Sequence, residues 1–247
     1  MKSEILYGIH PVFEALASRR RTVHQIYLQH GFKSDRLARL ASVATRSGIL
    51  IKTIKSSEIK NLAGTAGHQG VAARVGPYPL ASVSDILEAA EDRGRPHFLL
   101  LLDNILDPQN LGATIRTALC AGVDGVIMPK DRSAPITPAV SRASAGALEH
   151  IRLSRVTNLV QTIKRIKKQG IWVMGLDKNA ELSLYDGDMT GSIAIVLGGE
   201  QKGLRPLVKQ NCDYLVSIPQ YGTVDSLNAS VAAAVSMYEA LRQRTKK

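Results

Sequence analysis

The sequence predicts an α/β protein of two domains, and three observations lead to that prediction. Short apolar runs alternate along the chain with stretches whose apolar residues recur at helical spacing. A break rich in glycine and proline, at residues 76–79, interrupts this alternation, and core-like apolar runs resume only at Phe98. A length of 247 residues also suits two modest domains better than one. We therefore expect a first domain over residues 1–76, a linker over 77–96 and a second domain over 97–247.

The first domain is expected to alternate helices and strands. Apolar side chains at every third or fourth position indicate helices, and β-branched residues bounded by glycine indicate strands. The expected elements are, in order, a helix over 9–18, a strand over 23–29, a helix over 34–47, a strand over 49–54, a short helix from 56 to about 64 and a strand over 70–75.

The second domain is expected to hold a largely parallel sheet. Its strand-like runs are short and continuously apolar, which is typical of strands covered by helices on both faces. These runs occupy 98–102, 125–128, 171–176, 193–197 and 214–218, and a helix over 227–242 closes the chain. A polar, helix-like stretch over 83–92 lies in the expected linker.

Composition narrows the class of protein. The formal net charge of +11 favours binding to polyanions such as nucleic acid, although an unspecialised basic surface has the same balance. Cys120 and Cys212 are far apart, which suits a reducing cytosol better than a disulfide framework or a metal site. The amino-terminal residues lack the apolar core of a signal peptide, and the longest apolar run, 98–102, is too short to span a bilayer. We expect a soluble cytoplasmic protein with no membrane contact and no metal.

Several familiar site patterns are absent from the sequence. No G-x-G-x-x-G follows a strand, and there is neither a G-x-x-x-x-G-K-[ST] loop nor an H-E-x-x-H helix. These absences disfavour a nicotinamide enzyme, a P-loop NTPase and a zinc hydrolase.

The first informative segment is Asn110-Leu-Gly-Ala-Thr-Ile-Arg116-Thr-Ala118. Asn110 is well suited to cap a helix that begins at Leu111, which is its plain structural interpretation. Gly112 is unfavourable in a first helical turn, so it indicates the close approach of a backbone or a ligand. Arg116 shares a helical face with Gly112, and an isolated arginine at such a position is usually a solvated charge.

Two later segments also join strand-like runs to helices. In Val196-Leu-Gly-Gly-Glu200-Gln-Lys-Gly203-Leu204, the glycines allow a sharp turn and leave backbone groups free for a ligand, although an ordinary tight turn has the same residues. The segment Ile218-Pro-Gln-Tyr-Gly222-Thr-Val-Asp-Ser226-Leu-Asn228-Ala-Ser-Val-Ala232 leads into an Ala-rich helix, which Ser226 or Asn228 could cap. A cap alone does not require the whole string.

Taken in order, the three segments resemble the signature motifs of the SpoU (TrmH-like) RNA ribose 2′-O-methyltransferases. The resemblance covers about 98–242 and extends to residues 7–11 and 68–71, which look like parts of the substrate-binding domain of that family. Residues 129–133 and 155–159 are most similar to its bacterial 23S rRNA guanosine 2′-O-methyltransferase subgroup.

The resemblance implies a fold, a cofactor and a site. The fold would be a small N-terminal α/β domain similar to ribosomal protein L30e, which helps to hold RNA, followed by a SPOUT-type α/β catalytic domain with a C-terminal trefoil knot. The enzyme would be a homodimer that uses S-adenosylmethionine and no metal. The cofactor would be held around Leu197, Gly198, Gly199, Ile218 and Leu227. The catalytic set would be Asn110, Arg116, Glu200, Ser226 and Asn228, with Arg116 stabilising the alkoxide that develops at the target ribose.

The predicted function is therefore S-adenosylmethionine-dependent 2′-O-methylation of a guanosine ribose in 23S rRNA, either free or in a large-subunit assembly particle. Three alternatives stay open: a tRNA ribose methyltransferase, an RNA-binding ribosome-assembly protein with an inert catalytic domain, and a base methyltransferase on the same fold. The two-domain layout disfavours tRNA, because tRNA-specific relatives often carry short terminal extensions instead.

Overall fold

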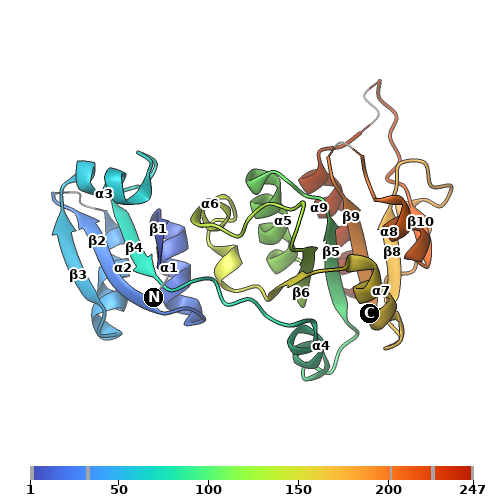
Figure 1. Ribbon diagram of the computed structural model, residues 1–247, viewed down its shortest axis with the longest axis horizontal. Coiled ribbons are helices and arrows are strands. Elements are labelled where there is room, and N and C mark those ends of the chain that lie inside the picture. The colour runs from blue at the N-terminus through green and yellow to red at the C-terminus, as the bar shows by residue number, and fades with distance from the viewer. Residues whose placement is uncertain (1–2, 32–33, 201, 224–225, 246–247) are drawn as a thin grey trace. The chain divides into compact units, whose positions relative to one another are not determined.

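The computed structural model describes residues 3–31, 34–200, 202–223 and 226–245, and the chain divides into two compact units (Figure 1). Unit 1 comprises Met1–Pro79 and Ile136–His150, and unit 2 comprises Leu80–Pro135 and Ile151–Lys247. Gln201, Val224 and Asp225, which belong to two of the motifs, lie outside the described residues. Within the described ranges, none of the helices is long and apolar enough to cross a membrane.

Unit 1 is built on a four-stranded sheet. Its strands lie in the order β1-β4-β2-β3, with β2 and β3 parallel and the other neighbours antiparallel. The six predicted helices and strands of this region are confirmed, and the short strand β1 is an addition. The elements are β1 (Glu4–Tyr7), α1 (Ile9–Ser18), β2 (Val23–Gln29), α2 (Asp35–Arg46), β3 (Leu50–Ile54), α3 (Ser56–Ala63), β4 (Val71–Val75), α6 (Pro138–Ala143) and the 3-10 helix η1 (Ala147–Glu149).

The two faces of this sheet bury different helices. Ile26 of β2 is buried with Val12 of α1 and Leu40 of α2. The next residue, Tyr27, points to the opposite face and packs in a cluster with Ile59 of α3. The alternation along β2 therefore gives unit 1 a helical layer on each side of its sheet.

A segment from much further along the chain completes unit 1. Residues Ile136–His150 pack on α1 and β1, and a Cβ added at Gly146 would lie only 2.7 Å from Glu14 Cγ. The buried Glu149 carboxylate accepts hydrogen bonds from Arg21 Nη1 at 3.3 Å and from Ser141 Oγ at 2.8 Å. Burial raises the pKa of Glu149, although Arg21 and Ser141 favour its charged form. This segment lies inside the range 97–247 that the sequence assigns to the second domain.

Unit 2 is built on a six-stranded sheet in the order β10-β8-β9-β5-β6-β7, whose strand pairs are all parallel. The predicted parallel sheet and its five predicted strands are confirmed. Strand β7 is an addition, because its four residues include the polar Ser154 and Arg155. The elements are α4 (Val83–Glu91), β5 (Phe98–Asp103), α5 (Pro108–Cys120), β6 (Gly125–Pro129), β7 (Leu153–Val156), α7 (Leu159–Lys167), β8 (Trp172–Leu176), the 3-10 helix η2 (Leu184–Asp186), β9 (Ile193–Gly198), α8 (Pro206–Asn211), β10 (Tyr214–Val216) and α9 (Ala229–Thr245).

Helices cover both faces of this sheet. Helices α4, α7 and α8 share one buried cluster with alternate residues of the strands, and α5 and α9 pack together on the other face. Val83, Ile86 and Leu87 of α4 are buried in that first cluster. Much of the expected linker, 77–96, is thus a packed part of unit 2, because the apolar residues of this polar helix fall on one side.

The strand order reverses between β5 and β9. From β5 the chain continues through α5 to β6 on one side, whereas from β9 it continues through α8 to β10 on the other. Ligands of open α/β sheets bind at such a reversal, outside the carboxyl ends of the strands. The trefoil knot that the resemblance implies stays a prediction.

Candidate functional site

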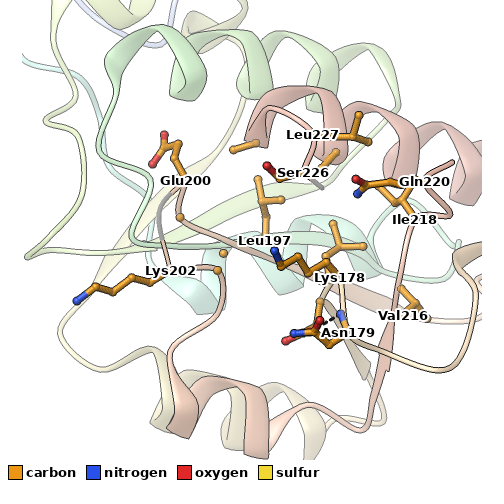
Figure 2. Close-up of a pocket in the computed structure, with 17 residues that line it drawn as sticks. Lys178, Asn179, Leu197, Glu200, Lys202, Val216, Ile218, Gln220, Ser226 and Leu227 are labelled. Carbon is orange, nitrogen blue, oxygen red and sulfur yellow. Dashed lines mark hydrogen bonds between the residues drawn. The ribbon is translucent and has the colours of Figure 1, made fainter. Parts of the chain in front are cut away.

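A cavity of about 450 Å³ opens beyond the carboxyl ends of β8, β9 and β10, beside the amino end of α9 (Figure 2). It adjoins the reversal of strand order on the β9 side, because residues that follow β9 line it and residues of β5 do not. Two of the predicted catalytic residues, Glu200 and Ser226, line it. All five residues predicted to hold a cofactor also line it, namely Leu197, Gly198, Gly199, Ile218 and Leu227.

The glycines after β9 are required by close backbone contacts. A Cβ at Gly198 would lie 2.2 Å from the carbonyl carbon of Gly203, and a Cβ at Gly199 would lie 2.4 Å from the carbonyl oxygen of Asn104. The chain doubles back between these positions, since the Gly203 N–H donates to the Gly199 carbonyl at 3.1 Å. One wall of the cavity is therefore bare backbone.

An ion pair fixes the end of this loop. Asp103, fully buried at the end of β5, accepts from Arg205 Nε at 2.7 Å and from the Arg205 backbone N–H at 2.9 Å. Arg205 Nη2 lies 2.6 Å from the same carboxylate. Several donors from one residue fix position as well as charge, so the loop is held against β5 just before α8 begins. Neither residue was singled out from the sequence.

The three motifs meet through one chain of hydrogen bonds. Asn110 Nδ2 donates to Glu200 Oε1 at 2.9 Å, and Asn228 Nδ2 donates to Asn110 Oδ1 at 3.0 Å. Asn228 Oδ1 accepts from the Ser230 backbone N–H at 2.9 Å, which caps α9. Asn228 therefore caps α9 and also contacts Asn110 of another motif, while its catalytic role stays a prediction.

The capping interpretation of Asn110 is wrong. Helix α5 begins at Pro108, and its cap is Asp107, whose side chain accepts from the Gln109 N–H at 2.9 Å. Proline at the first helical position moves the start three residues ahead of Leu111. The Asn110 amide is therefore inside the first turn, where both of its polar atoms are available to Glu200 and Asn228.

Arg116 stands apart from these residues. It lies in the middle of α5, its side chain is exposed, and it does not line the cavity. Within the described residues, no hydrogen bond or ion pair involves it. The structure therefore brings Asn110, Glu200, Ser226 and Asn228 together but leaves Arg116 as an unengaged surface cation.

The end of β8 adds residues that the sequence analysis missed. Asp177, Lys178 and Asn179 line the cavity, and Figure 2 shows the Lys178 side chain extending into it. Burial alone would raise the pKa of Asp177, but hydrogen bonds from Lys209 and from the Asn179 N–H outweigh it and keep the pKa below its usual value. These three residues belong to none of the three motifs. Following the predicted strand 171–176 to its carboxyl end would have found them.

The cavity combines surfaces of two kinds. Leu197, Val216, Ile218 and Leu227 supply apolar contacts, and the glycine loop supplies backbone donors and acceptors. This combination suits a small organic ligand that has both apolar and polar parts. In the part of the chain that the structure describes, no three His, Cys, Asp or Glu side chains are grouped to hold a metal ion.

Comparison with known families explains this arrangement. Residues 97–238 match the SpoU rRNA Methylase family, and residues 5–81 match a family described as RNA 2′-O ribose methyltransferase substrate binding. The chain belongs to the SpoU rRNA methylase family. The predicted resemblance is confirmed, and the SpoU match spans all three motifs.

Individual relatives match this SpoU chain over almost its whole length and over almost their own. The 23S rRNA (guanosine-2′-O-)-methyltransferase RlmB of Pseudomonas syringae pv. tomato is 42% identical over 248 residues, which cover 99% of this chain and 97% of that protein. A putative TrmH family tRNA/rRNA methyltransferase of Staphylococcus haemolyticus is 39% identical over 244 residues, covering 99% and 97%. The SpoU methyltransferase AviRb from Streptomyces viridochromogenes, solved with AdoMet, has the same fold, with a TM-score of 0.83, 24% identity and coverage of 99% and 92%.

Proposed function

We propose that this chain is an enzyme that transfers a methyl group from S-adenosylmethionine to the ribose 2′-oxygen of a guanosine in 23S rRNA. The observation that carries the proposal is the junction of Asn110, Glu200 and Asn228 by hydrogen bonds beside a glycine-walled cavity. Relatives similar over almost the whole chain and named 23S rRNA (guanosine-2′-O-)-methyltransferase support the substrate.

The cavity suits S-adenosylmethionine. Leu197, Ile218 and Leu227 offer apolar surface to the adenine ring, and the backbone at Gly198 and Gly199 offers donors and acceptors that no side chain covers. When bound, this cofactor supplies an activated methyl group. AviRb, whose fold this chain shares, was solved in complex with it.

In this proposal, the side chains around the cavity position the ribose and stabilise the negative charge that forms on its 2′-oxygen. We assign Asn110 the role of holding the Glu200 carboxylate, and Glu200 and Ser226 the role of orienting the incoming nucleotide. Arg116 is assigned to the target itself, where its guanidinium stabilises the negative charge that develops on the 2′-oxygen as the hydroxyl passes its proton to water and the oxygen takes the methyl group. Because arginine stays protonated in proteins, this role is electrostatic and Arg116 is not the proton acceptor.

We also propose a homodimer and an RNA-holding role for the N-terminal region. Val231 and Tyr238 of α9 are 46% and 50% exposed and lie seven positions apart, so they form an apolar stripe that a second copy would cover. The substrate-binding family matched by residues 5–81 supports RNA contact there. This function belongs in the cytoplasm, with free 23S rRNA or a large-subunit assembly particle as the substrate.

The proposal is tested by methyl transfer from labelled S-adenosylmethionine to RNA from a strain that lacks this protein. The labelled RNA is sized and digested to find the modified nucleotide. We expect label on a guanosine ribose of 23S rRNA, and we expect Arg116→Ala to lose transfer by about 100-fold or more, the scale of one electrostatic contact to a transition state, while it still binds the cofactor. Arg116→Lys is the matched variant that keeps the charge.

A tRNA substrate is the second candidate, because the Staphylococcus haemolyticus relative is named a tRNA/rRNA methyltransferase. Label in tRNA alone would replace the substrate and keep the enzyme. Label on a base would assign the chain to base methylation. Cofactor binding without transfer to free RNA or assembly particles would favour the RNA-binding alternative.

A further inference from the structure

Tyr221 is the most exposed large apolar side chain of the described residues. It is 98% exposed, so it contributes almost nothing to the packing of its own chain. It lies in the segment between β10 and α9, directly after Gln220, which lines the cavity. Within the described part of the chain, its hydroxyl forms no hydrogen bond. Both the ring faces and the polar end of Tyr221 are available to another molecule.

We propose that Tyr221 is a stacking platform for a nucleobase of the RNA substrate, either the target guanosine or its neighbour. The inference rests on the proposed function and names a residue that recognises the substrate of that site. Proteins that bind unpaired RNA stack its splayed bases on exposed aromatic side chains. Every base has a π-face, so a single aromatic ring can hold a nucleotide without reading its sequence.

The position of Tyr221 along the chain fits this role. It lies three residues after Ile218 and five before Ser226, both of which line the cavity. A base stacked on Tyr221 would therefore lie close to the place where the ribose must meet the methyl group. Figure 1 shows the chain beyond β10 extending away from the strands of unit 2 before it returns to α9.

Charge near the cavity favours a nucleic acid over an apolar partner. Lys178 and Lys202 both line the cavity, and Lys202 is exposed with no ion pair to any described residue. Asp177 and Glu200 line the same cavity, so these two lysines place cations among carboxylates there, and cations suit the phosphates of a nucleotide. The apolar stripe that suits a second copy is elsewhere, at Val231 and Tyr238 of α9.

The test compares Tyr221→Ala, Tyr221→Phe and the control Tyr185→Ala. Tyr185 is another exposed tyrosine of unit 2, at 54%, and does not line the cavity. We expect Tyr221→Ala to raise the KM for RNA about 5- to 100-fold, the range of one lost base stack. Affinity for S-adenosylmethionine and the melting temperature should not change. Tyr221→Phe and Tyr185→Ala should retain the KM of the wild type.

A fluorescence experiment separates stacking from turnover. Trp172 is the only tryptophan, so Trp172→Phe combined with Tyr221→Trp leaves one indole at the proposed platform. Adding an unpaired 23S rRNA fragment should quench its emission. Quenching without methyl transfer by the wild type would retain the platform and reject the proposed function, whereas transfer without quenching would overturn the platform alone.

Three other results would overturn the platform. An unchanged KM in Tyr221→Ala would show that the ring does not contact RNA. Equal losses in Tyr221→Phe and Tyr221→Ala would assign the effect to a hydrogen bond of the hydroxyl. A shift toward monomer in sedimentation of Tyr221→Ala would assign the ring to contact with a second copy.

Discussion

Asn228 Nδ2 donates to Asn110 Oδ1 at 3.0 Å, and this hydrogen bond joins the amino end of α9 to the first turn of α5. The other atoms of the two amides are also engaged. Asn228 Oδ1 accepts from Ser230, and Asn110 Nδ2 donates to Glu200. The position of Glu200 is therefore linked to the cap of α9, Asn228, which lies 28 residues later in the sequence.

We predict that Asn228→Ser separates the cap from the site. Serine still caps a helix, so the free energy of unfolding should stay within a few tenths of a kcal/mol, whereas Asn228→Ala should lose about 1 kcal/mol. Neither residue can donate to Asn110 as the amide does, so both variants should lose about 10-fold or more in kcat, the equivalent of one hydrogen bond to a charged network. Thermal unfolding and methyl-transfer assays measure the two effects. Full activity in Asn228→Ser would reduce Asn228 to a cap.

Gly198→Ala should close the cavity wall. The new Cβ would lie 2.2 Å from backbone that cannot rotate away, so the loop from Gly199 to Gly203 must shift. Overpacking of this kind costs about 1–3 kcal/mol, and we expect a fall of at least 10-fold in affinity for S-adenosylmethionine. Calorimetric titration measures this affinity.

Gly191→Ala is the matched control for this variant. Gly191 has nothing within 4 Å of the added Cβ and lies away from the cavity. Its affinity for the cofactor should equal that of the wild type. An unchanged affinity in Gly198→Ala would mean that the loop adapts and that its backbone is not the binding surface.

The sequence predicted most of the fold because its strongest patterns were the buried ones. Every residue of the run Phe98–Leu102 is 1% exposed or less, and such a run is hard to mistake for anything but a central strand. Element β7 was missed because Ser154 and Arg155 break its apolar pattern. The 83–92 stretch was assigned to a linker because glycine and proline surround it and core-like runs resume only at Phe98, yet four of its apolar residues are buried.

The site was predicted in part for a similar reason. Glycine and asparagine motifs marked Gly198 and Asn110, but the partner of a side chain is set by tertiary structure. Nothing local indicates that Asp103 holds Arg205, or that Arg21 meets Glu149 at a separation of 128 residues. Such pairs become visible only once strand order and segment packing are known.

Removal of residues 1–76 should leave the cofactor site intact but open the segment from Ile136 to His150. All residues that line the cavity belong to unit 2, so affinity for S-adenosylmethionine should remain measurable while RNA affinity falls. The segment would lose Arg21 and the side chain of Gln69, which accepts from Arg142 Nη1 at 3.2 Å. Trypsin should then cleave after Arg142 at least 10-fold faster, because cleavage follows the population of the open segment.

The full chain with Arg142→Lys is the control for that experiment, since it keeps a cleavable residue and all of unit 1. Its cleavage at position 142 should remain slow. Equal rates in the truncated and full chains would mean that residues 136–150 hold their structure without the N-terminal region. Loss of cofactor binding on truncation would contradict the independence of unit 2.

The two cysteines should differ sharply in reactivity. Cys120 is exposed, whereas burial, with the negative charge of Asp213, raises the pKa of Cys212 to about 12. Because only the thiolate reacts, at pH 8 about one Cys212 in 10⁴ is reactive, and its rate should rise as the pH rises toward 12. Mass spectrometry after iodoacetamide treatment at pH 8 should find label on Cys120 alone. In urea both cysteines should react. Rapid labelling of Cys212 in the native protein would contradict the prediction and would mean that the end of α8 opens.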